Sequence, residues 1–221
     1  MISIVPSLPA ASFEEIHSLA WALRGCVPEL QIDIVDNKFV PAISWPFTEV
    51  NPLEDLKRLK EIVEQFDIEM DCMVEKPEQY LDAFVALGVA RVIVHMGSTE
   101  VYEDIIAHAR THGYKIGLAF TNDVPISEVE KYVEKIDFVQ IMGIVHVGKQ
   151  GQPFDQRTLE TAKTLRSHYP ELQIAVDGSV NADTIKSLYD AGVNRFAPGS
   201  AIAKQDDPKA AYAHLKSLVT E

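Results

Sequence analysis

Short apolar runs alternate with longer amphipathic segments along the whole chain. The runs have the length of strands, whereas the segments between them repeat apolar positions at helical spacing. Eight strands are therefore predicted, at residues 2–5, 30–35, 68–73, 91–96, 115–120, 137–142, 172–177 and 195–199.

The amphipathic segments carry helix-start and helix-stop signals. Ser12 lies three residues before Glu15, and the same capping-box spacing separates Ser127 from Glu130. Gly192 ends another segment, as glycine commonly does at a helix C-terminus. We therefore expect helices between the strands.

Eight strand–helix units in 221 residues agree with the number of units and the length of a (β/α)8 barrel. The alternative, an open doubly wound sheet, would use fewer strands and usually has a glycine-rich fingerprint after its first strand. The start of this chain lacks that fingerprint, and no linker, charge block or low-complexity segment interrupts the pattern. We predict the α/β class, as a single TIM-barrel domain over residues 1–221.

Several polar side chains fall near the ends of predicted strands, where the active sites of such barrels lie. Gln31 and Asp33 share one face of their strand, Asp71 lies near the end of another, and Asp177 ends a third. A single aspartate at a strand end is more often a cap or a turn acceptor. Because three different strands each carry such an aspartate, we expect the three aspartates and Gln31 to converge, with Asp33 facing Asp177 across the barrel mouth.

Two neighbouring polar residues have other expected places. Asp36 lies on the opposite face of its segment from Asp33, which favours a role in a turn. His95 ends the fourth predicted strand. It either faces the mouth or is a hydrogen-bonded histidine of the core or rim.

Glycine-bearing loops follow the last three predicted strands, and glycine lets a backbone approach a phosphate closely. TIM barrels often bind phosphate in the loops after strands seven and eight. Ser179 and Ser200 add hydroxyl donors. The expected phosphate-binding positions are Gly148, Gly151, Gly178, Ser179, Gly199 and Ser200.

Composition narrows the class of partner. The formal net charge of −13 disfavours nucleic acid. The two cysteines have no metal-type or redox-type spacing, and no apolar run reaches the ~18 residues of a membrane helix. We expect a cytoplasmic homo-oligomer that contacts neither nucleic acid nor membrane.

The chain resembles the ribulose-phosphate 3-epimerase family of ribulose-phosphate-binding barrels along nearly its whole length. The matching pieces are PS (6–7), SFEE (12–15), DIVDNKFVP (33–41), MVEKP (73–77), GQPF (151–154), VDGSV (176–180) and PGSAI (198–202). The resemblance implies an isomerase of carbohydrate metabolism, in the pentose phosphate class, that acts on a small phosphorylated ketose.

The resemblance also implies roles for individual residues. Asp33 and Asp177 match the two aspartates that exchange protons with C3 of the sugar from opposite sides. Ser7 matches a serine near the substrate, and Met73 and Met142 match methionines that line the sugar site.

The metal site of the family is altered in this sequence. The family holds a divalent metal with two histidines and the two catalytic aspartates, and Gln31 and Asp71 occupy the histidine positions here. The set Gln31, Asp33, Asp71 and Asp177 offers only oxygen ligands, which suits Mg²⁺ or Mn²⁺ better than Zn²⁺. A site without metal, in which the carboxylates share a proton, is the other expectation.

Two other functions remain open at this point. A sister-family phosphosugar lyase or synthase would carry an Asp-x-Lys-x-x-Asp pattern on a strand, and residues 33–38 have no lysine two positions after an aspartate. A non-catalytic phosphosugar-binding barrel is favoured by the missing histidines and opposed by the retained Asp33 and Asp177. The leading expectation is C3 epimerisation by two-aspartate proton transfer.

Overall fold

The sheet at the centre of the molecule consists of short parallel strands. A computed structural model describes residues 2–8, 11–148 and 151–219. The strands are β1 (Ser3–Ile4), β2 (Ser7–Leu8), β3 (Glu29–Val35), β4 (Asp67–Met73), β5 (Arg91–His95), β6 (Lys115–Phe120), β7 (Phe138–Met142), β8 (Gln173–Asp177) and β9 (Arg195–Ala197). Their order is β1-β9-β8-β7-β6-β5-β4-β3-β2.

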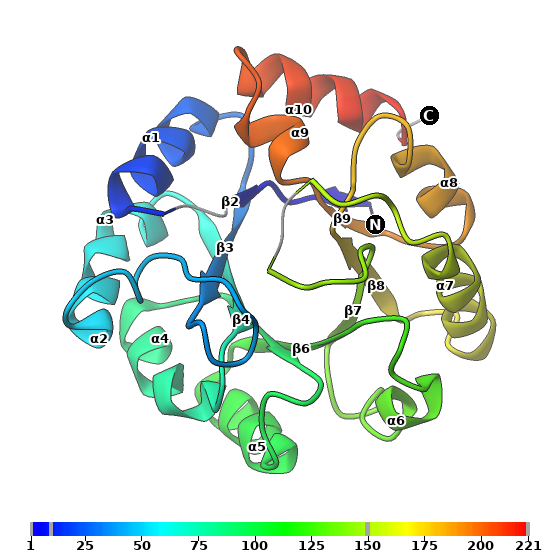
Figure 1. Ribbon diagram of the computed structural model, residues 1–221, viewed down its shortest axis with the longest axis horizontal. Helices are drawn as coiled ribbons and strands as arrows, with labels where there is room; N and C mark the ends of the chain where they lie inside the picture. Colours follow the sequence, from blue (N-terminus) through cyan, green and yellow to red (C-terminus); the bar gives the residue numbers. More distant parts are fainter. Residues whose placement is uncertain (1, 9–10, 149–150, 220–221) are drawn as a thin grey trace.

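The first predicted strand is divided, and this division closes the barrel. β1 pairs with β9, with Ser3 beside Arg195, whereas β2 pairs with β3, with Ser7 beside Gln31. β1 and β2 are separated only by Val5 and a proline, so one short stretch of chain joins both edges of the sheet. The predicted α/β TIM barrel is confirmed, and Figure 1 shows the strands as a ring inside a ring of helices.

Helices cover the outer surface of the barrel (Figure 1). The α-helices are α1 (Phe13–Leu23), α2 (Pro52–Asp55), α3 (Lys60–Val63), α4 (Leu81–Leu87), α5 (Tyr102–His112), α6 (Ile126–Glu130), α7 (Arg157–His168), α8 (Ile185–Asp190), α9 (Ser200–Ala203) and α10 (Pro208–Ser217), with 3-10 turns η1 (Leu56–Leu59) and η2 (Pro77–Tyr80). No helix of the described ranges is both long enough and apolar enough to cross a membrane.

One of the two predicted capping boxes contains an N-cap in the structure, and the other does not. Ser12 caps α1, because its side chain accepts a hydrogen bond from the backbone N–H of Glu15. The predicted capping box at Ser127 and Glu130 is wrong. Helix α6 begins earlier, and its N-cap is Pro125, so Ser127 lies inside the helix. The ring of Pro125 fixes the φ angle at the N-cap, and the helix begins at the next residue.

Alternation along the strands divides apolar from polar positions. Ile32, Ile34, Ile174 and Val176 are fully buried and belong to the large core cluster that the helices share. The residues between them point into the barrel. As a result, the interior of the barrel carries many polar groups.

The amino-terminal end of the barrel contains buried ion pairs. The guanidinium of Arg195, which is 1% exposed, lies 2.9 Å from Glu69 and 2.8 Å from Glu29. Arg91 approaches Glu29 at 3.0 Å. Burial raises the pKa of Glu69, and the charge of Arg195 opposes that shift. These pairs fill the end of the barrel opposite the predicted mouth.

Candidate active site

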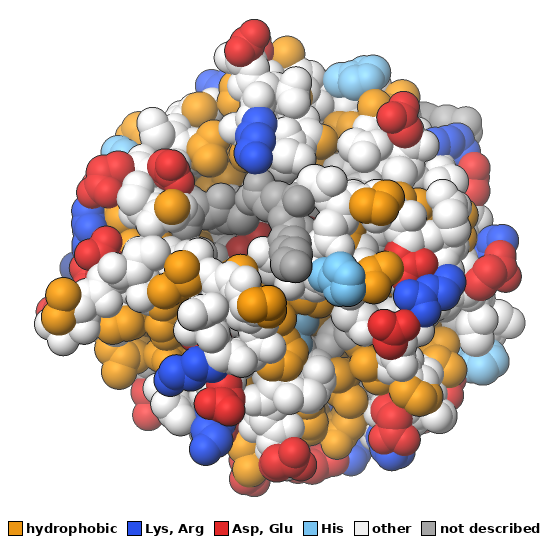
Figure 2. All heavy atoms as spheres, in the orientation of Figure 1, with side chains coloured by type: hydrophobic (Ala, Val, Ile, Leu, Met, Phe, Trp, Pro, Cys, Tyr) orange, Lys and Arg blue, Asp and Glu red, His pale blue; other side chains and the backbone are white. Residues whose placement is uncertain are grey.

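A cavity of about 620 Å³ opens at the carboxyl ends of the strands. In Figure 2, acidic side-chain atoms are visible at the bottom of the hollow at the centre of this face. The predicted site residues that line the cavity are Ser7, Asp33, Met73, Met142, Gly148, Gly151, Asp177, Gly178, Ser179, Gly199 and Ser200. Gln31 and Asp71 are fully buried and are not among its lining residues.

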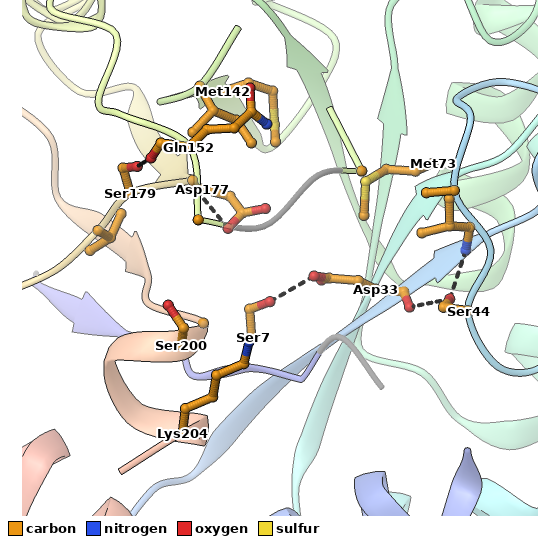
Figure 3. A pocket seen from close by; sticks show the side chains of 18 of the residues that line it. Ser7, Asp33, Ser44, Met73, Met142, Gln152, Asp177, Ser179, Ser200 and Lys204 are labelled. Atoms are coloured by element: carbon orange, nitrogen blue, oxygen red, sulfur yellow. Dashed lines mark hydrogen bonds between the residues drawn. The ribbon is translucent and has the colours of Figure 1, made fainter. Parts of the chain in front are cut away.

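Asp33 is held from two sides by hydrogen-bond donors. The Ser7 hydroxyl donates to one carboxylate oxygen at 2.8 Å, and the Gln31 amide donates to the other at 2.9 Å. Ser44 fixes the backbone here, since its hydroxyl donates to the Asp33 carbonyl and accepts from the Val35 N–H (Figure 3). Burial, together with the nearby charge of Asp71, raises the pKa of Asp33 to about 7.

Asp177 lies at the end of β8, and its side chain points into the same space as Asp33 (Figure 3). Its carboxylate accepts a hydrogen bond from the Gly178 N–H at 2.7 Å. Burial, and then the charges of Asp33 and Asp71, raise the pKa of Asp177 well above its usual range. Two carboxyl groups in one cavity therefore resist simultaneous ionisation.

Asp71 lies directly beside Asp33 in the register of β3 and β4, but its contacts lie below the cavity. Nε2 of His95 lies 2.7 Å from one carboxylate oxygen. The amides of Gln140 and Gln31 donate to the other, at 2.8 and 3.4 Å. Of the two places expected for His95, the structure shows the second, a buried and hydrogen-bonded histidine that is 2% exposed.

The acidic group could hold a metal ion. Asp33, Asp71 and Asp177 each offer a carboxylate oxygen, and these atoms lie within 4.8 Å of one another. An all-oxygen set of this kind fits Mg²⁺ or Mn²⁺. Gln31 differs from the expectation, because its amide nitrogen faces Asp33 and Asp71. Its buried Oε1 has no partner among the described residues, and it would have to exchange places with the nitrogen before Gln31 could serve as a ligand.

The glycine-bearing loops form the opposite wall of the cavity from β4. Gly178 has φ of +96°, and a Cβ there would lie 2.9 Å from Ile144, so this turn requires glycine. The Ser179 hydroxyl donates to the Gln152 carbonyl at 2.6 Å (Figure 3). That hydroxyl proton is already engaged, so an anion contact from Ser179 would come from its backbone N–H.

Sequence reasoning missed three residues around the site. Gln140 lies on the same face of β7 as Met142, so strand alternation could have revealed it. Lys204 follows α9 and lines the cavity, and its side chain extends toward Ser7 (Figure 3). Ser44 lies outside every predicted strand, and only the folded chain shows that it turns back to contact the strand that carries Asp33.

Asp36 has the turn role that its position in the sequence predicts. Its carboxylate accepts hydrogen bonds from the backbone N–H groups of Lys38, Phe39 and Glu75. These contacts fix the loop after β3 against the loop after β4. Asp36 therefore shapes the rim of the mouth, and it is absent from the residues that line the cavity.

Comparison with known proteins identifies the family. A family model described as the ribulose-phosphate 3 epimerase family matches residues 3–203. The chain belongs to this family. The ribulose-phosphate 3-epimerase of Schizosaccharomyces pombe is 30% identical over 219 residues, which cover 98% of this chain and 93% of the relative. The enzyme of the same name from Mycobacterium leprae is 31% identical, over 96% of this chain and 93% of the relative.

Solved structures of other enzymes share the fold of this family. The 3-hexulose-6-phosphate synthase from Salmonella typhimurium superimposes with a TM-score of 0.74 at 16% identity, covering 99% of this chain and 98% of that chain. KGPDC from Streptococcus mutans gives a TM-score of 0.70 at 15% identity, covering 99% of this chain and 97% of that chain. These identities are too low to indicate more than a shared barrel.

Proposed function

We propose that the chain is a ketose-phosphate 3-epimerase in which Asp33 and Asp177 exchange protons with C3 of the substrate. The observation that supports this most directly is the pair of buried carboxyl groups in one cavity, both with raised pKa values. Family membership supports the same reaction class.

The two pKa shifts suit an acid and a base in one site. Near neutral pH, Asp33 is close to its pKa of about 7, and the raised pKa of Asp177 favours the protonated form of that group. The Asp33 carboxylate removes the proton at C3, which the neighbouring ketone makes acidic, and the electron pair forms an enediolate. Asp177 then gives its proton to the other face of C3. The carbon is inverted, and the two aspartates have exchanged protonation states.

Hydrogen bonds position Asp33 for this step. The Ser7 hydroxyl and the Gln31 amide occupy one lone-pair direction on each carboxylate oxygen, which fixes the plane of the group. They also stabilise its ionised form, because both are donors. A general base needs such positioning, since proton transfer requires contact at hydrogen-bond distance.

A divalent cation held by Asp33, Asp71 and Asp177 would supply positive charge that stabilises the enediolate. Other residues of the site have roles that do not require a bound cation. Hydrogen bonds from His95 and Gln140 hold the Asp71 carboxylate in place beside Asp33. The two methionines of the cavity wall give it apolar surfaces against which the carbon chain of a sugar can lie.

The phosphate of the substrate would bind at the wall formed by Gly178, Ser179, Gly199 and Ser200. Backbone N–H groups in glycine turns can bind a dianion even when the protein is acidic overall. Lys204 adds a cationic side chain to the same part of the cavity. A phosphate anchored there would leave the sugar carbons to extend toward the two aspartates.

The test is proton exchange at C3 of ribulose 5-phosphate in D₂O, followed by NMR, with chelator and then with Mg²⁺ or Mn²⁺. We expect loss of the C3 proton and formation of the C3 epimer. Asp177→Asn should slow both by roughly 10² to 10⁴-fold while it preserves binding of the phosphosugar. Binding without exchange under every metal condition would instead favour a non-catalytic phosphosugar-binding barrel.

A further inference from the structure

A second group of metal-ligating side chains lies on the outside of the barrel. Asp82 on α4 and His108 and His112 on α5 each offer a ligand atom, and these atoms lie within 4.8 Å of one another. We propose that these three residues bind a transition-metal ion of the Zn²⁺ class, at a surface site separate from the barrel mouth.

The helix geometry brings the two histidines together. Residues four apart lie on the same helix face, one turn from each other. The His108 and His112 rings are 4.3 Å apart between centroids and are tilted by 34°. Asp82 reaches them from the neighbouring helix, with its Oδ1 3.1 Å from Nε2 of His108.

His108 is already oriented for a ligand role. Its Nδ1 lies 3.0 Å from the hydroxyl of Tyr114, a residue that is 8% exposed and therefore fixed in the core. Histidines that bind metals usually hydrogen bond through their other ring nitrogen, which sets the tautomer and the ring plane. Nε2 of His108 is thereby directed at the position where Asp82 and His112 converge.

The remaining ligands are free enough to close around an ion. The Asp82 side chain is 95% exposed, and His112 is exposed as well, so both can change rotamer without disturbing the core. Metal–ligand distances of about 2 Å are then within reach, with the fourth position open to water.

The donor chemistry separates this site from the mouth. Two imidazoles and one carboxylate suit Zn²⁺ and its neighbours among the transition metals, whereas the three carboxylates at the mouth suit hard cations. A bound ion would also join α4 to α5 and would stabilise the fold in proportion to its concentration. An ordinary surface ion pair between His108 and Asp82 would explain that contact but would give His112 no role.

The experiment is a titration of the metal-free protein with Zn²⁺ by calorimetry, repeated with Co²⁺ to follow its ligand-field absorption. We expect one zinc ion to bind per chain. Its affinity should be unchanged in Asp177→Asn and at least tenfold lower in His112→Ala. His168→Ala is the matched control, since this helical histidine is likewise paired with one carboxylate, at 2.7 Å from Glu130.

His112 is exposed at the end of its helix, so the thermal midpoint of His112→Ala without metal should match that of the parent. Zinc should raise the midpoint of the parent and of His168→Ala but not that of His112→Ala. Equal zinc affinity in His112→Ala and the parent would overturn the proposal, as would loss of the bound zinc ion in Asp177→Asn alone.

Discussion

Replacing Asp33 by asparagine should stabilise the protein at alkaline pH while it abolishes proton transfer. The ordinary pKa of 3.8 describes the unfolded chain, and in the folded protein the pKa of Asp33 is about 7. Below pH 3.8 the group is protonated in both states. As the pH rises to 7, the unfolded chain loses this proton first, so the contribution of Asp33 to stability falls until both states are ionised.

The magnitude follows from the size of the shift. A difference of about three pKa units corresponds to roughly 4 kcal/mol of stability lost at pH 8, and to less than half of that at pH 5. Asparagine cannot ionise, and it can keep both contacts, by accepting from Gln31 and donating to Ser7. We expect Asp33→Asn to gain about 2 to 4 kcal/mol at pH 8, or several degrees in Tm.

The assay is urea unfolding of the parent and of Asp33→Asn at pH 5 and pH 8, in chelator and without phosphosugar. Glu64→Gln is the control, because neutralising an exposed carboxylate should change stability little at either pH. A gain that is absent at pH 8, or that is equal at the two pH values, would refute the assignment of a raised pKa to Asp33. Adding Mg²⁺ or Mn²⁺ should reduce the gain if the parent binds the ion at this carboxylate.

The remaining predictions concern binding and the turn at the cavity wall. Lys204→Met should raise KM for a ketose phosphate roughly tenfold with little change in kcat, an effect that added salt should diminish, whereas Lys209→Met should not. Gly178→Ala should lower the free energy of unfolding by about 1 to 3 kcal/mol, measured in urea, because it forces a Cβ against Ile144 at positive φ. The double variant Gln31→His, Asp71→His should bind Zn²⁺ more tightly than the parent in a zinc titration, since it adds two imidazole ligands.

Strand alternation explains why much of the site could be predicted. Asp33, Asp71 and Asp177 lie within the last three residues of their strands and have apolar neighbours on the other face, so the period of two residues fixes their direction. Seven of the eight predicted strands have boundaries within two residues of those in the structure. The catalytic and binding roles of these residues stay predictions.

Other features depend on contacts that no local pattern contains. The division of the first strand follows from its two partners, β9 and β3, which lie far apart in the chain. The direction of the Gln31 amide depends on the carboxylates around it. Lys204 belongs to the cavity because a short helix turns its end toward Ser7. These features can be known only from the tertiary structure.

The divided first strand has a consequence for the order in which the barrel can assemble. Ser7 donates its backbone N–H to the Pro198 carbonyl and its hydroxyl to Asp33, so it joins the last strand to the third. The bond from Ser7 to Pro198 spans nearly the entire chain, and contacts between residues so far apart in sequence form slowly. During synthesis, the segment at Ser7 leaves the ribosome long before its partner at Pro198 exists. In a chain still in translation, Asp33 would therefore be present before the last strand exists. The barrel mouth would become complete only when β9 pairs with β1 and Pro198 accepts the hydrogen bond from Ser7.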